Sequence, residues 1–108
     1  MSFVTSHVLD TALGRPAAGI PVALISPDGE VIATAETDAD GRVAALGPDS
    51  LPAGIYRIEF EVAGYLQRTE QAALYPRVTI EAVLDPAGGH YHLPLLLSPF
   101  GYSTYRGS

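Results

Sequence analysis

Three histidines carry the most reactive side chains of this sequence, and two of them, His90 and His92, are separated by a single residue. On a strand both imidazoles would project from one face, because side chains two positions apart share a face. Together with His7 from a second strand, they could hold a tetrahedral zinc ion with water in its fourth position. Alternatively, one imidazole could take a proton from water while an arginine holds the oxygens of a substrate. The spacing alone is compatible with both chemistries, and also with histidines that only pack on a strand.

The segment 102–108 combines aromatic, hydroxyl and guanidinium groups at a point where chains usually fray. It could be an edge strand with an exposed end, or a tail that folds into a site. In the second case Arg106 and the terminal carboxylate would bring fixed charges, and Gly107 would permit a tight bend.

Strands and turns must position these side chains, because nine prolines and eleven glycines interrupt the chain too often for long helices. Apolar and polar residues alternate most clearly in the segment 56–62, and also in 3–9, where Thr5 and His7 share a face. Only residues 69–75 look helical, and Pro76 limits them to about two turns. We expect strands at residues 3–9, 20–26, 31–37, 42–46, 56–62, 78–84, 90–97 and 101–106. The pattern predicts an all-β fold: one domain, residues 1–108, forming an antiparallel sandwich of about eight short strands with one short helix.

Composition excludes several classes of function. Twelve acidic residues stand against six basic ones, all arginine, and the net charge of −6 disfavours a nucleic-acid partner. The lack of cysteine removes disulfides, cysteine nucleophiles and thiolate metal sites. No apolar run approaches the ~20 residues of a membrane helix, and the first residues do not read as a signal peptide. We therefore expect a cytoplasmic protein without a membrane partner.

Two segments carry a family resemblance. The first reads SHVLD at residues 6–10 and continues as GRPA at residues 14–17, and the second reads HYHLPLLLSPFGYSTYRGS at residues 90–108. Both resemble the transthyretin-like family, and the resemblance covers essentially the whole chain. Within that family, a terminal Tyr-Arg-Gly-Ser is typical of the 5-hydroxyisourate hydrolases and not of the hormone carrier transthyretin.

The resemblance implies a hydrolase of urate degradation that needs neither metal nor cofactor. Its substrate would be 5-hydroxyisourate, whose six-membered ring opens by hydrolysis of a ring amide to 2-oxo-4-hydroxy-4-carboxy-5-ureidoimidazoline. The functional positions of the family fall on His7, Arg42, His92, Tyr105, Arg106, Gly107 and Ser108.

Each position then has an implied role. Either His7 or His92 would be the base for water, and Arg42 would donate hydrogen bonds to the carbonyl oxygens of the substrate. Ser108 and its carboxylate would orient groups, and Tyr105 would lie against the planar substrate. The second histidine of the pair, His90, would support the site.

The resemblance also implies a homotetramer, a dimer of dimers with its sites between the dimers. The strands expected at 90–97 and 101–106 are apolar or aromatic and contain no lysine, so they lack a common protection of exposed edge strands. Two other functions stay open. One is a non-catalytic carrier of a small ligand on the same fold, and the other is a zinc hydrolase that uses all three histidines.

Overall fold

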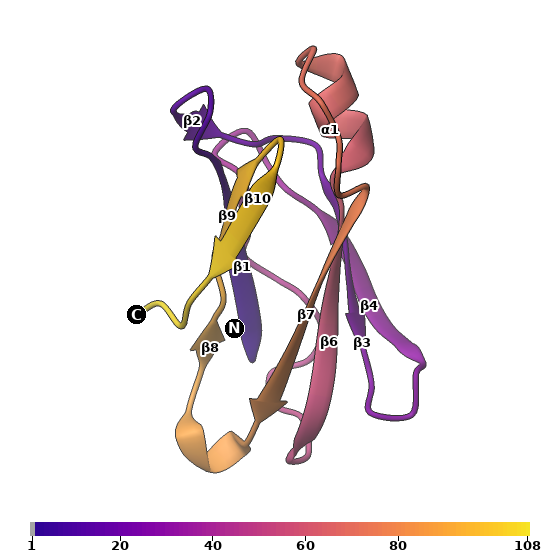
Figure 1. Ribbon diagram of the computed structural model, residues 1–108. Helices are drawn as coiled ribbons and strands as arrows, with labels where there is room; N and C mark the ends of the chain where they lie inside the picture. Colours follow the sequence, from indigo (N-terminus) through magenta and orange to yellow (C-terminus); the bar gives the residue numbers. More distant parts are fainter. Residues whose placement is uncertain (1) are drawn as a thin grey trace.

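Two β-sheets face each other in the computed structural model, which describes residues 2–108 (Figure 1). One sheet has six strands, ordered β10-β9-β1-β2, with β5 and β8 also paired to β1. Its strands are β1 (Val4–Asp10), β2 (Arg15–Pro16), β5 (Arg42–Val43), β8 (Tyr91–His92), β9 (Leu95–Ser98) and β10 (Gly101–Thr104). The other sheet has the order β4-β3-β6-β7. Its strands are β3 (Pro21–Ile25), β4 (Val31–Glu36), β6 (Gly54–Glu61) and β7 (Arg77–Leu84). The predicted all-β sandwich is therefore confirmed.

Alternating burial decides which face of each strand meets the core. In β1, Val4 and Val8 are fully buried, whereas Thr5 is half-buried on the opposite face, which it shares with His7. In β6, Phe60 is fully buried at the centre of the core. Burying one such side chain contributes about 1.5–3 kcal/mol, so the apolar residues hold β1 in this orientation. The face of β1 that carries Thr5 and His7 is therefore turned away from the core.

The six-stranded sheet is mixed, and the antiparallel description needs correction at two pairings. β1 runs parallel to β8, with Thr5 opposite His92, and parallel to β9, with Val8 opposite Leu95. The remaining pairings of this sheet are antiparallel. The reason is that the chain does not return from β7 by a hairpin. It crosses to the other sheet through a short 3₁₀ turn, η1 (Pro86–Gly88), and such a crossover allows parallel pairing.

The predicted strand 90–97 is two strands, because Leu93 and Pro94 interrupt it. Proline has no N–H to give to a sheet. The predicted strand 101–106 is also shorter and ends at Thr104. Thr104 lies opposite Leu95, the first residue of β9, so the residues beyond it have no partner in that strand.

The helix lies earlier than predicted. α1 spans Ala63–Arg68, directly after β6, while residues 69–75 form turns and loop. Thr69 ends the helix, and its hydroxyl donates to the carbonyl of Tyr65 at 2.9 Å. Glu70 then adopts a left-handed backbone with φ of 57°. Burial of Tyr65 and Leu66 fixes the position of this short helix more strongly than the helix propensity of the following residues.

The predicted strand 42–46 is reduced to β5, because the chain turns inward after Val43. Leu46 is buried, and its N–H donates to the hydroxyl of Ser2 at 2.9 Å. Among residues 2–108, no helix is long and apolar enough to cross a membrane.

Candidate functional site

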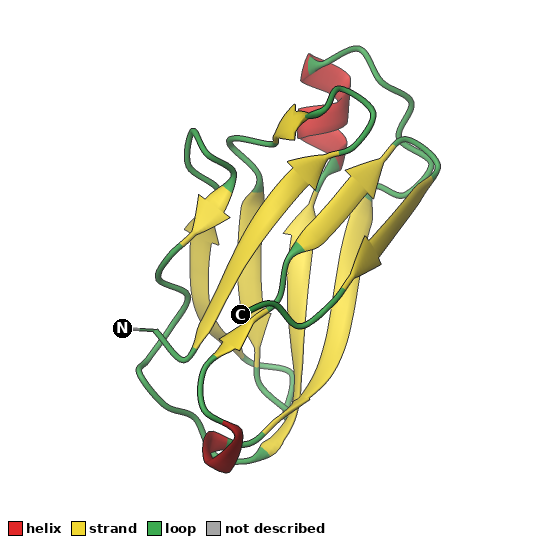
Figure 2. Ribbon diagram, turned by 90° about the vertical axis from the view of Figure 1, so that its left-hand side faces the viewer, coloured by secondary structure: helices red, strands yellow, loops and turns green. Residues whose placement is uncertain are grey.

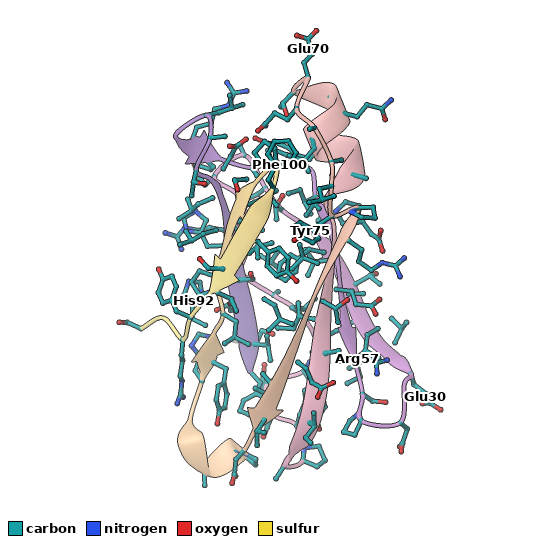
Figure 3. All side chains as sticks on the ribbon, in the orientation of Figure 1. Glu30, Arg57, Glu70, Tyr75, His92 and Phe100 are labelled. Carbon is teal, nitrogen blue, oxygen red and sulfur yellow. The ribbon has the colours of Figure 1, made fainter. Side chains whose placement is uncertain are left out.

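A cleft of about 290 Å³ opens on the outer face of the six-stranded sheet. Figure 2 looks onto this sheet, and Figure 3 shows His92 on the side that points away from the other sheet. The cleft is lined by Thr5, Ser6, Arg42, Val43, Ala44, His90, His92 and Ser108. Four of the residues expected from the sequence, namely Arg42, His90, His92 and Ser108, therefore meet here.

Strand β1 pairs with the two short strands, β5 and β8, that carry Arg42 and His92. In its parallel pairing with β8, Thr5 lies opposite His92. In its antiparallel pairing with β5, His7 lies opposite Arg42. The position of Arg42 is reinforced from the preceding turn, where the Asp38 carboxylate accepts hydrogen bonds from the backbone N–H groups of Asp40 and Arg42, both at 2.9 Å.

The Thr5 hydroxyl contacts both histidines of the pair. Its Oγ1 lies 2.8 Å from Nδ1 of His92 and 3.0 Å from Nε2 of His90. Nδ1 of His92 is thereby engaged, which leaves Nε2 as the nitrogen available to a reacting water. Burial lowers the pKa of His92 below its ordinary value of 6.5, and electrostatic interaction with Arg42, His90 and His7 lowers it further. Both effects favour the neutral imidazole, which is the form that a base requires.

His7 lies next to this group but is not among the residues that line the cleft. Its Nε2 is 2.7 Å from the carbonyl oxygen of Asp40. Because a carbonyl oxygen only accepts hydrogen bonds, Nε2 carries a proton in this contact. His7 therefore stabilises the turn before Arg42 and contributes to the electrostatic environment of His92.

The segment 105–108 folds back against β8. The N–H of Gly107 donates to the carbonyl of His92 at 2.7 Å, and the two residues form an isolated bridge. The Arg106 guanidinium donates to the carbonyls of Gly88 at 2.7 Å and His90 at 3.1 Å, and it lies 4.1 Å from the centre of the Tyr91 ring. Arg106 thus holds the backbone that carries the two histidines, and does not line the cleft. Tyr105 is 54% exposed and does not line it either.

The geometry does not favour a zinc site built from the three histidines. Within residues 2–108, no three side chains of His, Asp or Glu are grouped so that they could hold a metal ion. His7 faces the Asp40 carbonyl, while His90 and His92 converge on a hydroxyl.

Thr5 and Ser6 are polar residues of the cleft that were not predicted as site residues from the sequence. The Ser6 hydroxyl donates to the carbonyl of Leu93 at 2.7 Å, whereas the Thr5 hydroxyl contacts the histidines. A threonine in a strand is common and attracts no attention by itself. The signal was nevertheless present, because the alternation in the segment 3–9 puts Thr5 on the same face as His7.

The fold and the cleft define a class of protein: a two-sheet sandwich of the transthyretin type with a histidine- and arginine-lined cleft on its outer face. The chain belongs to the HIUase/Transthyretin family, whose family model matches residues 4–107.

Individual relatives match over their full length. The 5-hydroxyisourate hydrolase of Caulobacter vibrioides is 41% identical, and the alignment covers 100% of both chains. The structure of Klebsiella pneumoniae 5-hydroxyisourate hydrolase matches with a TM-score of 0.87 at 40% identity, covering 97% of this chain and 98% of that one. Sea bream transthyretin in complex with thyroxine matches with a TM-score of 0.86 at 32% identity, covering 96% and 93%.

Proposed function

We propose that this protein hydrolyses 5-hydroxyisourate to 2-oxo-4-hydroxy-4-carboxy-5-ureidoimidazoline. The observation that carries the proposal is the convergence of Arg42, His92 and Ser108 in one cleft. Family membership and similarity to 5-hydroxyisourate hydrolases over the full chain support the same substrate.

His92 is the proposed base. A water molecule gives a proton to Nε2 of His92 while its oxygen attacks the carbonyl carbon of the ring amide. The carbonyl becomes a tetrahedral oxyanion, which then collapses as the ring C–N bond breaks and the nitrogen takes up the proton held on Nε2 of His92. Partial burial and the positive charge of Arg42 favour the neutral form of His92 before the step, because they lower its pKa. Positioned proton transfer of this kind contributes about 10²- to 10⁴-fold in rate.

Arg42 is the proposed partner of the developing negative charge. Its guanidinium is a planar fork of donors that matches the oxygens of the substrate. Donors aimed at the place where charge develops stabilise the transition state more than the ground state. A permanent positive charge in the cleft also favours attack of a neutral water on the carbonyl next to it.

The segment 105–108 supports the cleft in this proposal. Ser108 lines the cleft and would orient the substrate, and the Gly107 and Arg106 contacts hold the backbone on either side of Tyr91. Tyr105 is exposed in the single chain and would lie against the planar substrate. His7 would act through the turn before Arg42.

The proposal includes a homotetramer arranged as a dimer of dimers. Phe100 and Tyr102 are exposed at 70% and 44% around the edge strand β10, and the sequence has no lysine to protect such an edge. A neighbouring chain over the open cleft would also give it a second wall. Light scattering should give a mass of about four times 11.4 kDa, and a stable monomer with full activity would contradict the shared site.

The decisive experiment is a direct assay. Fresh 5-hydroxyisourate is generated from urate with urate oxidase, and its ultraviolet decay is followed with and without this protein. Acceleration that is proportional to protein concentration supports the proposal. Binding without acceleration would instead identify a carrier, and activity lost on chelation and restored only by zinc would identify the metal-dependent alternative.

A further inference from the structure

The Thr5 hydroxyl lies between two imidazoles that belong to the same short segment. The distances from Oγ1 are 2.8 Å to Nδ1 of His92 and 3.0 Å to Nε2 of His90, both within hydrogen-bond range. A hydroxyl has one proton to donate and lone pairs that accept. With Thr5 bonded to both rings through its single proton and a lone pair, it donates to one histidine and accepts from the other.

Two hydrogen-bond patterns satisfy this condition. In the first, Nδ1–H of His92 donates to Thr5, and the Thr5 hydroxyl donates to Nε2 of His90. In the second, Nε2–H of His90 donates to Thr5, and the hydroxyl donates to Nδ1 of His92. Only the first pattern leaves a lone pair on Nε2 of His92, the nitrogen that takes a proton from water in the proposed hydrolysis. Once Nε2 of His92 has taken up a proton, transfer of one proton from His92 to Thr5 and of one from Thr5 to His90 converts the first pattern into the second.

We propose that Thr5 is a positioning residue that fixes the His92 tautomer and conducts its excess proton to His90. The inference rests on the proposed hydrolysis, in which Nε2 of His92 takes a proton from water. His92 then gives its Nδ1 proton to Oγ1 of Thr5, and Thr5 gives its own hydroxyl proton to Nε2 of His90. His92 ends neutral with its proton on Nε2, Thr5 ends as a hydroxyl that donates to Nδ1 of His92, and His90 ends as an imidazolium. When the ring C–N bond breaks, Nε2 of His92 gives its proton to the ring nitrogen, and the reverse transfer from His90 through Thr5 restores the first pattern. No covalent bond other than those to protons changes in the relay.

The surroundings favour transfer in this direction. His92 is half-buried and lies near the positive charge of Arg42, so an imidazolium at this position is disfavoured. His90 is exposed, so its imidazolium is solvated and can exchange its proton with buffer. Its backbone is held in place, because the carbonyl of His90 accepts a hydrogen bond from Arg106. The charged or titratable groups near the relay are Arg42, His7, Arg106 and the two histidines themselves.

Four variants separate orientation from proton transfer. Thr5→Val keeps the shape of a β-branched side chain but removes the hydroxyl, while Thr5→Ser keeps the hydroxyl. His90→Gln keeps an oxygen that can accept from Thr5 but cannot take up a proton. Thr34→Val, at an exposed threonine of β4 in the other sheet, is the matched control. For each, kcat and KM for 5-hydroxyisourate are measured at several concentrations of imidazole buffer, with the tetramer checked by light scattering.

The expected pattern is specific. Thr5→Val should lower kcat by roughly 10-fold or more with little change in KM, since an acid or base step contributes about 10²- to 10⁴-fold. Thr5→Ser and Thr34→Val should stay within about threefold of the wild type, as neither loses a relay group. His90→Gln should lose roughly 10-fold in kcat and regain it as the imidazole concentration rises, because a soluble base replaces the missing acceptor.

Other outcomes overturn the relay. An unchanged kcat in Thr5→Val removes Thr5 from the reaction. A loss in Thr5→Val with none in His90→Gln means that Thr5 only orients His92. A loss in His90→Gln that does not respond to buffer means that His90 is structural. If Thr5→Val does not fold, the buffer response of His90→Gln, at an exposed position, still decides. A wild-type protein without activity refutes the proposed hydrolysis itself, which is a different result from an active wild type with unaffected variants.

Discussion

Gly107 and His92 are in direct contact, and no larger residue than glycine fits at position 107 without moving the histidine. The Gly107 N–H donates to the His92 carbonyl at 2.7 Å. A Cβ on residue 107 would lie 2.6 Å from Cδ2 of the His92 ring, well inside contact distance. Cδ2 is bonded to Nε2, the proposed base, so residue 107 packs against the part of the ring that carries the reacting nitrogen.

Gly107→Ala should therefore displace the His92 ring and lower kcat/KM by about 10²-fold, since misplacement by an ångström can cost that much. Residue 107 is not part of the hydrophobic core, so the thermal unfolding temperature should change little. Isourate decay and thermal unfolding measured on the same preparation test this. A normal rate in Gly107→Ala would mean that the His92 ring does not need its observed position.

Removal of residues 105–108 should abolish most of the activity while the sandwich persists. These residues contribute Ser108 to the cleft and the Gly107 and Arg106 contacts to β8, but no residue to the apolar core. A chain ending at Thr104 is assayed for isourate decay, circular dichroism and mass. Wild-type turnover in a folded truncated chain would show that the tail is only an extension of the edge strand.

Arg42→Lys should lower kcat/KM by roughly 10²-fold or more. Lysine keeps the positive charge but loses the planar fork, and one directed donor to a developing oxyanion is worth about 3 kcal/mol. Steady-state kinetics with fresh 5-hydroxyisourate measure the effect, and Arg57→Lys on the other sheet is the control. Near-normal kinetics in Arg42→Lys would remove this arginine from the site.

The pH dependence should reflect the low pKa of His92. A base works only when deprotonated, so kcat/KM falls as the pH drops through the pKa of the free enzyme. Burial, Arg42, His90 and His7 lower that pKa, so the fall should occur below pH 6.5, the ordinary value for histidine. Arg42→Gln removes one positive charge and should move the His92 titration to higher pH. Titration of the His92 ring by NMR in both proteins checks the sign, and an unshifted or lower pKa in Arg42→Gln would contradict it.

Tyr65→Phe should destabilise the fold by about 1.5–3 kcal/mol at pH 7, the usual range for a hydrogen bond to a charged group. The Tyr65 hydroxyl donates to the buried Asp10 carboxylate at 2.6 Å. Burial by itself would raise the pKa of Asp10. Hydrogen bonds from Tyr65, Leu13, Gln71 and Ala12 outweigh it and leave the pKa lowered.

A carboxylate with a lowered pKa stabilises the fold above its unfolded pKa, and that stabilisation is lost as the pH falls through the folded pKa. Wild type and Tyr65→Phe should therefore converge in stability below about pH 4, near the unfolded pKa of aspartate. Urea unfolding at a series of pH values measures the difference. A constant difference down to pH 2 would mean that the hydroxyl acts independently of the Asp10 charge.

Much of the sandwich could be predicted from the alternation of apolar and polar residues. In a strand with one buried face, every second side chain points into the core and is apolar. This is why the faces of β1 and β6 were predicted correctly. The break at Pro94 and the position of α1 depend on what each segment meets in the other sheet. Tyr65, for example, is buried and reaches Asp10, which is 55 residues away in the chain. No local pattern contains that contact.

In the candidate site, too, some features could be predicted from the sequence and others depend on contacts between distant segments. Four residues predicted for the site meet in the cleft, and the other four do not line it: the first set is Arg42, His90, His92 and Ser108, and the second is His7, Tyr105, Arg106 and Gly107. The functional roles of all eight stay predictions. The contact of Thr5 with both histidines depends on parallel pairing between β1 and β8, which the sequence analysis took to be absent. The orientation of Arg106 toward the Gly88 and His90 carbonyls likewise follows from the end of β10 at Thr104, set by the register with β9.

The parallel pairing of β1 with β8 and β9 has a kinetic consequence. Thr5 and His92 are 87 residues apart along the chain, whereas β3 and β4 are joined by a tight turn closed by the Ser26 and Glu30 backbones. Pairings between distant segments form slowly, because closing a long loop costs chain entropy before any stabilising contact is made. During refolding, the hairpin and its sheet should produce a β-type circular dichroism signal before the two remote segments meet. Enzymatic turnover is then the last property to return, and its recovery reports completion of folding more strictly than any spectroscopic signal from the strands.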